Sequence, residues 1–188
     1  MAIQPEYLFM SVEDYLALDR SSQDARYEYV DGYAYVLAGG TANHSVIGVN
    51  IAGELRASLR GRSCVVYNTD IKVRLSENRY VRPDAAVSCD TRDHQGKIDI
   101  ISHASAVFEV LSPSTEAYDR GKKSSYYRAC PTIEEYVLVD TDRRYVEVYH
   151  RSGEAFWSLT TFESGDELQL ASLNIHFPVD ALYENTFL

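Results

Sequence analysis

Two apolar segments of this 188-residue chain each contain one acidic side chain. In YVRPDAAVSC, Asp84 lies between Pro83 and an Ala-Ala-Val run, and in AVFEVLSPST, Glu109 lies between Phe108 and Val110. The second segment alternates too little for a half-exposed strand and is typical of one buried on both faces. Burying an ionised carboxylate is costly unless a cation or a metal ion pairs with it. A fold that buries both segments must therefore place positive charge beside them.

The N-terminal third predicts a helix, a hairpin and a second helix. SVEDYLAL opens with a capping-box-like pattern, which indicates a short helix. RYEYVDGYAYVLA contains Asp31-Gly32 between Tyr- and Val-rich runs, a strong signal for a β-hairpin. NHSVIGVNIAGELRASL has apolar residues at every fourth position, which predicts an amphipathic helix capped by Thr41 or Asn43.

The rest of the chain alternates strands with one further helix. CVVYNTDIKVRL, YVRPDAAVSC and AVFEVLSP predict three strands, and TEAYDRGKKSSYYRAC predicts a helix that Pro131 ends. EEYVLVD predicts another buried strand, and RRYVEVYHR, AFWSLTTF and DELQLASL predict antiparallel strands in the tail. No linker or repeat interrupts this order. We therefore expect a mixed α/β sheet flanked by helices, in a single domain over residues 1–188.

Charge and cysteine content limit the cellular setting and the partner. The net charge is −10, which argues against a nucleic-acid partner, yet residues 56–132 carry 13 basic and nine acidic groups. That stretch is either ordinary solvated surface or a local basic face for phosphates. The three cysteines are too few and too far apart to predict a disulfide framework or a CxxC metal site. Without a secretory signal or a membrane-spanning segment, we expect a cytoplasmic protein.

A shared metal ion would explain both acids. If their strands are neighbours, Asp84 and Glu109 converge, and two like charges in one place raise a pKa and destabilise the fold. Mg²⁺ removes the conflict, because it prefers oxygen ligands and keeps much of its water; Mn²⁺ is the expected substitute. Such a metal can acidify a bound water and neutralise charge on a phosphoryl group. A nearby lysine, Lys122 or Lys123, would add positive charge for the phosphate or position the water.

These segments resemble the PD-(D/E)XK superfamily, the restriction-endonuclease-like fold, and more closely an uncharacterised bacterial group called Uma-type putative endonucleases. The resemblance lies in YEYVDG, NHSVIG, VRPDAAV, FEVLSPST, YDRGKKSSYYRA and EEYVLVD, in that order, over roughly residues 25–150. It implies an αβββαβ core with an N-terminal β-hairpin and a C-terminal antiparallel extension. It also implies Mg²⁺-dependent hydrolysis of phosphodiester bonds in DNA.

The resemblance also assigns roles to individual residues. Asp84 and Glu109 match the two acidic motif positions and would bind the metal, together with the carbonyl of Val110. The motif lysine should fall at position 111, where this chain has Leu111. A lysine on the next helix would substitute, and spacing from the preceding aspartate favours Lys123 over Lys122.

Two further positions, Glu28 and His44, match residues that recur in the Uma-type group. They would act as an extra metal ligand and as a polar partner near the scissile phosphate. Each candidate also has a structural interpretation: a turn for Asp84, an ion pair for Glu109, a surface cross-strand residue for Glu28, a helix cap for His44 and solvated surface for Lys123.

Three functions therefore remain open. The leading hypothesis is a Mg²⁺-dependent DNA endonuclease acting as a homodimer, because a two-fold pair cuts both strands most easily. The second is a catalytically inactive nuclease-like fold that binds DNA or protein, which Leu111 and the acidic net charge favour. The third is a metal-dependent phosphoesterase that acts on a small nucleotide.

Overall fold

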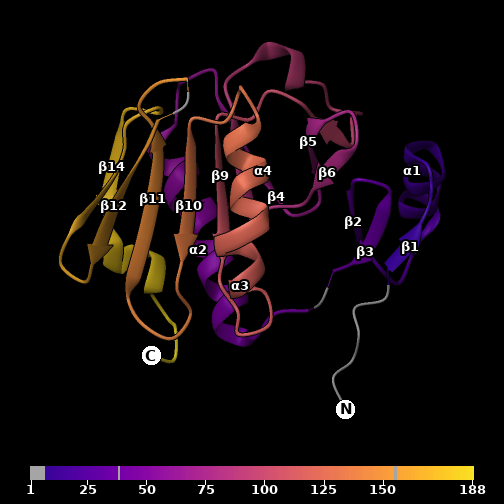
Figure 1. The fold of residues 1–188 in the computed structure, drawn as a ribbon. Coiled ribbons are helices and arrows are strands. Elements are labelled where there is room, and N and C mark those ends of the chain that lie inside the picture. Colours follow the sequence, from indigo (N-terminus) through magenta and orange to yellow (C-terminus); the bar gives the residue numbers. More distant parts are fainter. Residues whose placement is uncertain (1–6, 38, 155) are drawn as a thin grey trace.

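The computed structural model describes residues 7–37, 39–154 and 156–188, which form two six-stranded sheets and a two-stranded one (Figure 1). The helical segments are α1 (Val12–Ser21), α2 (Ala42–Ser58), η1 (Thr91–Asp93), α3 (Glu116–Tyr118), η2 (Asp119–Lys123), α4 (Ser124–Ala129) and η3 (Val179–Tyr183). The first strands are β1 (Tyr7–Phe9), β2 (Tyr27–Val30), β3 (Tyr33–Val36), β4 (Val65–Asn68), β5 (Lys72–Ser76), β6 (Arg79–Val81) and β7 (Ala85–Ser88). The others are β8 (Ile100–Ile101), β9 (Ala106–Val110), β10 (Glu135–Val139), β11 (Tyr145–Arg151), β12 (Trp157–Glu163), β13 (Glu167–Leu170) and β14 (Ile175–Pro178).

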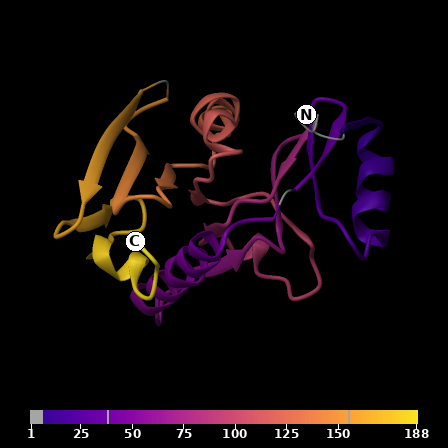
Figure 2. The same cartoon turned by 90° about the horizontal axis from the view of Figure 1, so that it is seen from below.

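The core sheet has the order β12-β11-β10-β9-β7-β4. Its β9 and β10 run parallel, and every other neighbouring pair is antiparallel. Helix α2 and the continuous helix α3–η2–α4 lie on opposite faces of this sheet (Figure 2). The predicted mixed α/β fold, its core and its antiparallel C-terminal extension are confirmed. Among the described residues, no helix is long and apolar enough to cross a membrane.

Alternate residues of the central strands build two separate cores. From β9, Phe108 and Val110 pack under α2, with Ile47 and Ile51 of that helix. Val107 of the same strand packs in the other core, which also contains Tyr127 of α4. Because neighbouring strand residues point to opposite faces, Glu109 must face the side of α4. β9 is buried along its whole length, which accounts for its apolar residues on both sides of Glu109.

The N-terminal sheet has the order β1-β3-β2-β6-β5-β8 and packs with α1. Helix α1 begins as predicted, with the Ser11 hydroxyl accepting a hydrogen bond from the Asp14 amide. The predicted hairpin joins β2 to β3 through Asp31 and Gly32, both at positive φ, as a tight hairpin turn requires. Positions 1–6, together with residues 38 and 155 at the ends of two predicted β segments, lie outside the described residues.

Two predicted strands are each divided between the sheets. The run 64–75 becomes β4 in the core sheet and β5 in the N-terminal sheet, because an Asx-type turn at Asn68–Asp70 redirects the chain. The run 80–89 becomes β6 and β7 in the same way, broken at Pro83. Proline lacks the amide that a ladder needs and restricts the residue before it. The sequence pattern alone did not show these two changes of sheet.

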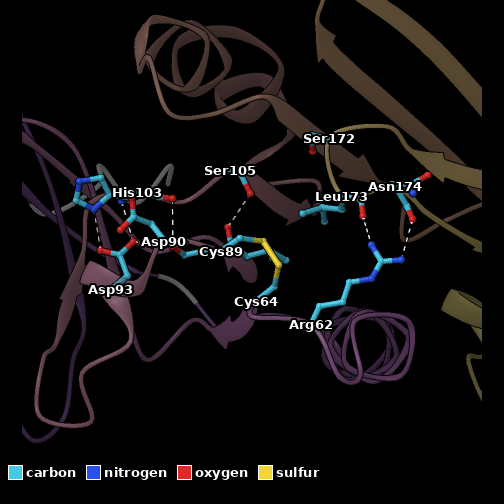
Figure 3. Close-up of a disulfide and its surroundings, with 12 residues drawn as sticks. Arg62, Cys64, Cys89, Asp90, Asp93, His103, Ser105, Ser172, Leu173 and Asn174 are labelled. Atoms are coloured by element: carbon cyan, nitrogen blue, oxygen red, sulfur yellow. Dashed lines mark hydrogen bonds and ion pairs between the residues drawn. A yellow bond between two sulfur atoms is a disulfide. The ribbon is translucent and has the colours of Figure 1, made fainter.

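The spacing of the cysteines did not predict a disulfide framework, but the structure contains one disulfide. Cys64 and Cys89 are joined by a disulfide (Figure 3). Cys130 is free and buried. Antiparallel pairing of Val65 with Ser88 brings the two cysteines side by side, although 25 residues separate them in the sequence. The bond ties the edge strand β4 to β7, the strand that directly follows Asp84.

Candidate functional site

The predicted site residues meet where the two sheets approach each other. Ala85 on β7 pairs with Phe108 on β9, so Asp84 and Glu109 stand opposite one another at the next step of the register. Glu28 reaches the same place from β2, and Lys123 from the helix that covers the face of Glu109. The structure therefore brings four charged residues from four distant segments together.

Asp84 is held by the strand beside it and by the first turn of α2. Its Oδ2 accepts a hydrogen bond of 2.7 Å from the Val110 amide and lies 3.5 Å from His44 Nε2. The Thr41 hydroxyl caps α2 by accepting a hydrogen bond from the His44 amide. This bond fixes the backbone position from which the His44 side chain extends. A hydrogen bond to Asp84 raises the pKa of His44, with smaller contributions from the Asp84 charge and the Val110 carbonyl. The His44 ring thus faces Asp84 and the Val110 carbonyl, two of the three oxygen ligands that the resemblance implies.

Lys123 points into the cluster of acids, whereas Lys122 is exposed. The Lys123 Nζ lies 2.8 Å from Glu109 Oε1, 3.0 Å from Glu28 Oε1 and 3.9 Å from Asp119 Oδ1. The helix is π-helical over Asp119–Lys123, and π-helical turns inside α-helices often occur at functional sites.

Glu109 has one oxygen saturated by the protein. Its Oε1 accepts from Lys123 and also, at 2.6 Å, from the buried hydroxyl of Tyr127. Among the described residues, no hydrogen bond reaches Glu109 Oε2, whereas Oε1 accepts the one from Tyr127. Asp84 shows a similar asymmetry, since the Val110 amide and the nearest His44 nitrogen both contact Oδ2. Each of the two acids therefore keeps one oxygen for a further ligand.

The cluster contains more acidic than basic side chains. Burial raises the pKa of Glu109 and of Asp119, and neighbouring carboxylates raise both further, against the opposing charge of Lys123. Burial alone would lower the pKa of Lys123, but Glu109, Glu28 and Asp119 outweigh it, so that pKa is also raised. Four carboxylates thus surround one ammonium group and one imidazole, and every shift favours uptake of positive charge.

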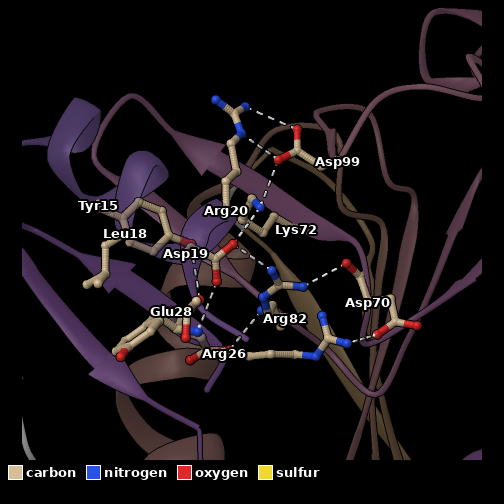
Figure 4. Close-up of polar contacts among 12 residues, drawn as sticks. Tyr15, Leu18, Asp19, Arg20, Arg26, Glu28, Asp70, Lys72, Arg82 and Asp99 are labelled. Carbon is tan, nitrogen blue, oxygen red and sulfur yellow. Dashed lines mark hydrogen bonds and ion pairs between the residues drawn. The ribbon is translucent and has the colours of Figure 1, made fainter. Parts of the chain in front are cut away.

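Glu28 is fixed by an ionic network that joins α1 to the N-terminal sheet. The Arg82 amide donates a 2.8 Å hydrogen bond to Glu28 Oε1, while the Arg82 guanidinium lies 2.7 Å from Asp19 (Figure 4). Asp19 also binds Lys72 Nζ at 2.7 Å and accepts from the Tyr27 amide. Tyr27 lies directly before Glu28, and Arg82 lies two residues before Asp84. This buried network therefore helps to set the relative positions of Glu28 and Asp84.

Two residues of the site were not among the sequence candidates. Asp119 lies four residues before Lys123, a helical spacing that signals a same-face pair. Tyr127 follows Lys123 by four residues on the same helix, but a tyrosine at that spacing is usually a core residue.

Leu111, at the position of the motif lysine, is buried in the core, and its amide donates to Val139.

The donor set suits a hydrated oxygen-binding cation. Within the described ranges, no group of three or more His, Cys, Asp or Glu side chains is arranged to enclose a metal ion. Two carboxylates and a backbone carbonyl at an acid-rich site nevertheless fit Mg²⁺, which usually binds through one or two carboxylates and retains several waters. They fit a structural zinc site poorly, because such sites are closed tetrahedra built from cysteine and histidine.

Comparison with known proteins gives one family and one fold. The Uma2 family, described as "Putative restriction endonuclease", matches residues 12–180. The uncharacterized protein slr1290 of Synechocystis sp. is 36% identical over 175 residues, covering 93% of this chain and 91% of the relative. A second Synechocystis protein, the uncharacterized sll1609, is 26% identical over 153 residues, covering 80% of this chain and 86% of the relative.

A solved structure supports the fold independently. The crystal structure of a putative nuclease belonging to DUF820 from Anabaena variabilis matches with a TM-score of 0.76 at 16% identity, covering 93% of this chain and 97% of the other. At that identity the likeness concerns the fold, which is that of a restriction-endonuclease-like protein. With the family match over residues 12–180, the chain belongs to the Uma2 family of putative restriction endonucleases.

Proposed function

We propose that this protein is a Mg²⁺-dependent DNA endonuclease whose site is built from Asp84, Glu109, Lys123, Glu28 and His44. Membership of the Uma2 family supports the class of reaction. The observation that carries the metal dependence is the charge imbalance: Glu28, Asp84, Glu109 and Asp119 surround Lys123 and His44. A divalent cation would offset that imbalance.

Asp84 Oδ1, Glu109 Oε2 and the Val110 carbonyl would hold the metal. These atoms belong to adjacent strands, so the rigid sheet presents them together. When bound, Mg²⁺ supplies Lewis-acid stabilisation of the phosphoryl charge and a more acidic water.

The other residues orient these ligands and place charge. Lys123 binds one oxygen of Glu109 and one of Glu28, which fixes both carboxylates relative to each other. His44 lies on the opposite side, against Asp84. Because its pKa is raised, His44 carries positive charge over a wider pH range than a free histidine, and in this proposal it would face a phosphate oxygen.

Nicking of supercoiled plasmid tests the proposal. Wild-type protein should nick with Mg²⁺ or Mn²⁺ and give little or no product with Ca²⁺. Asp84→Asn should lose both metal binding and nicking, because it removes a charged ligand. Asp142→Asn is the matched control: it makes the same change at an exposed position on the turn after β10 and should behave as wild type. Equal nicking by wild type and Asp84→Asn would reveal a contaminating nuclease.

A second candidate function is a non-catalytic module that binds DNA or protein through the same fold. Leu111 favours it, since the motif lysine is absent from its usual strand position. DNA binding without nicking under any metal would establish this function instead. Association into a homodimer belongs to the endonuclease proposal, and sedimentation of the protein with and without duplex DNA tests it.

A further inference from the structure

We infer that Tyr127 is a positioning residue that selects which oxygen of Glu109 is offered to the metal. The inference rests on the proposed function and extends it to a residue outside the motif positions. It concerns the hydroxyl group alone, because the ring of Tyr127 has a separate role in the core.

The Tyr127 hydroxyl has a single side-chain partner in the site. Tyr127 is fully buried on α4, and its Oη donates a 2.6 Å hydrogen bond to Glu109 Oε1. The ring packs against Tyr136, with centroids 4.8 Å apart, so the phenol cannot swing away. A buried hydroxyl that donates to a carboxylate makes a charge-assisted bond, which is stronger than a neutral one.

Tyr127 and Lys123 contact the same oxygen of Glu109. Both donors reach Glu109 Oε1, at 2.6 Å and 2.8 Å, from the same helix four residues apart. Two donors on Oε1 restrict rotation of the carboxylate, which leaves Oε2 as the oxygen available to a metal. One donor would leave the group free to rotate, because the terminal torsion of a glutamate side chain is broad.

A carboxylate held in one orientation contributes to metal affinity. Partners that hold a metal ligand typically change metal affinity by about 10–100-fold when they are removed. We therefore expect Tyr127→Phe to weaken Mn²⁺ binding about tenfold. Turnover should fall at saturating DNA with KM for DNA unchanged, since the hydroxyl is buried and cannot contact the substrate.

The control separates this effect from lost stability. Tyr183 is equally buried, and its hydroxyl makes three backbone contacts, to Asp140 and Tyr145, in the turn between β10 and β11. Tyr183→Phe therefore removes more hydrogen bonds than Tyr127→Phe but touches no acid of the site. Tyr127→Leu, which also lacks the hydroxyl, provides a second variant at the same position.

The test is calorimetric titration of each folded variant with Mn²⁺ in the absence of DNA, with circular dichroism to check the fold. A loss of affinity in both Tyr127 variants, with Tyr183→Phe within twofold of wild type, supports the inference. Equal affinity of Tyr127→Phe and wild type overturns it, and so does an equal loss in Tyr183→Phe. If wild type itself binds no Mn²⁺, or binds it as Asp84→Asn does, the proposed function fails and the inference fails with it.

Discussion

Glu28 on β2 and Lys123 on the helix over the core sheet lie 3.0 Å apart, and this ion pair joins the N-terminal sheet to the core. Both side chains are buried. The candidate site is therefore not confined to the motif strands, because one of its acids comes from a hairpin more than fifty residues before Asp84. The Glu28–Lys123 pair therefore couples the candidate site to the packing of the two sheets.

Replacing Glu28 with glutamine tests that coupling. The amide oxygen can still accept from the Arg82 amide, but the charge that faces Lys123 is lost. We expect the free energy of unfolding to fall by about 1.5–3 kcal/mol, the range for a hydrogen bond to a charged group. Urea denaturation measures the change, and Glu77→Gln, an exposed glutamate in the turn between β5 and β6, should show almost none. Equal stability of the two variants would contradict the coupling.

Lys123 should be more important for stability than a surface lysine. Lys123→Met leaves Glu28, Glu109 and Asp119 buried without their ammonium partner, and we expect a loss of about 3–5 kcal/mol. Lys122→Met, at the exposed neighbouring position, should change stability by less than about 0.5 kcal/mol.

The stability of Lys123→Met and Lys122→Met should also respond differently to divalent cations. Because binding to the folded state stabilises it, Mg²⁺ or Ca²⁺ should recover part of the stability that Lys123→Met loses. Thermal unfolding with and without millimolar metal measures the recovery. A metal effect that is the same in Lys123→Met and Lys122→Met would argue against a cation site among these acids.

The sequence predicted the elements of the core, because these depend on local patterns, and it predicted that Asp84 and Glu109 converge if their strands are neighbours. An apolar run with one acid identifies a buried strand, and the two strands are adjacent in the sheet. The helix that carries Lys123 was also visible, as was the hairpin turn at Asp31-Gly32. Periodicity and turn chemistry are sufficient for such features.

The features that the sequence did not predict depend on which distant segments pair. Nothing local in the run around Pro83 shows that its two halves join different sheets. The bond between Cys64 and Cys89 follows from the register of β4 on β7, which no spacing rule gives. The role of Tyr127 could not be predicted for the same reason, because its hydroxyl contacts Glu109 only when the helix lies over that strand.

The disulfide should contribute measurably to stability. Joining residues 25 positions apart restricts the unfolded chain, and a loop of that length gives about 3 kcal/mol in the chain-entropy account. The double variant Cys64→Ser, Cys89→Ser should therefore unfold at a lower temperature than oxidised wild type. A reductant should lower the unfolding temperature of wild type but leave the double variant unchanged. If the reductant affects both alike, the bond is not responsible.

Acid should weaken the protein through Asp19. Burial would raise the pKa of this carboxyl, but the hydrogen bond from Lys72 and the charge of Arg82 outweigh it, so the pKa lies below its ordinary value of 3.8. A carboxylate whose pKa is lower in the folded chain stabilises the fold fully above its unfolded pKa, and this contribution is lost as pH falls through the folded value. Wild type should therefore exceed Asp19→Asn in free energy of unfolding by a constant margin near neutral pH, and the margin should shrink below about pH 3.8. Denaturation of both proteins between neutral and strongly acid pH measures the margin, with Asp24→Asn, an exposed aspartate, as the control. A margin that stays constant into strong acid would show that Asp19 does not contribute through its charge.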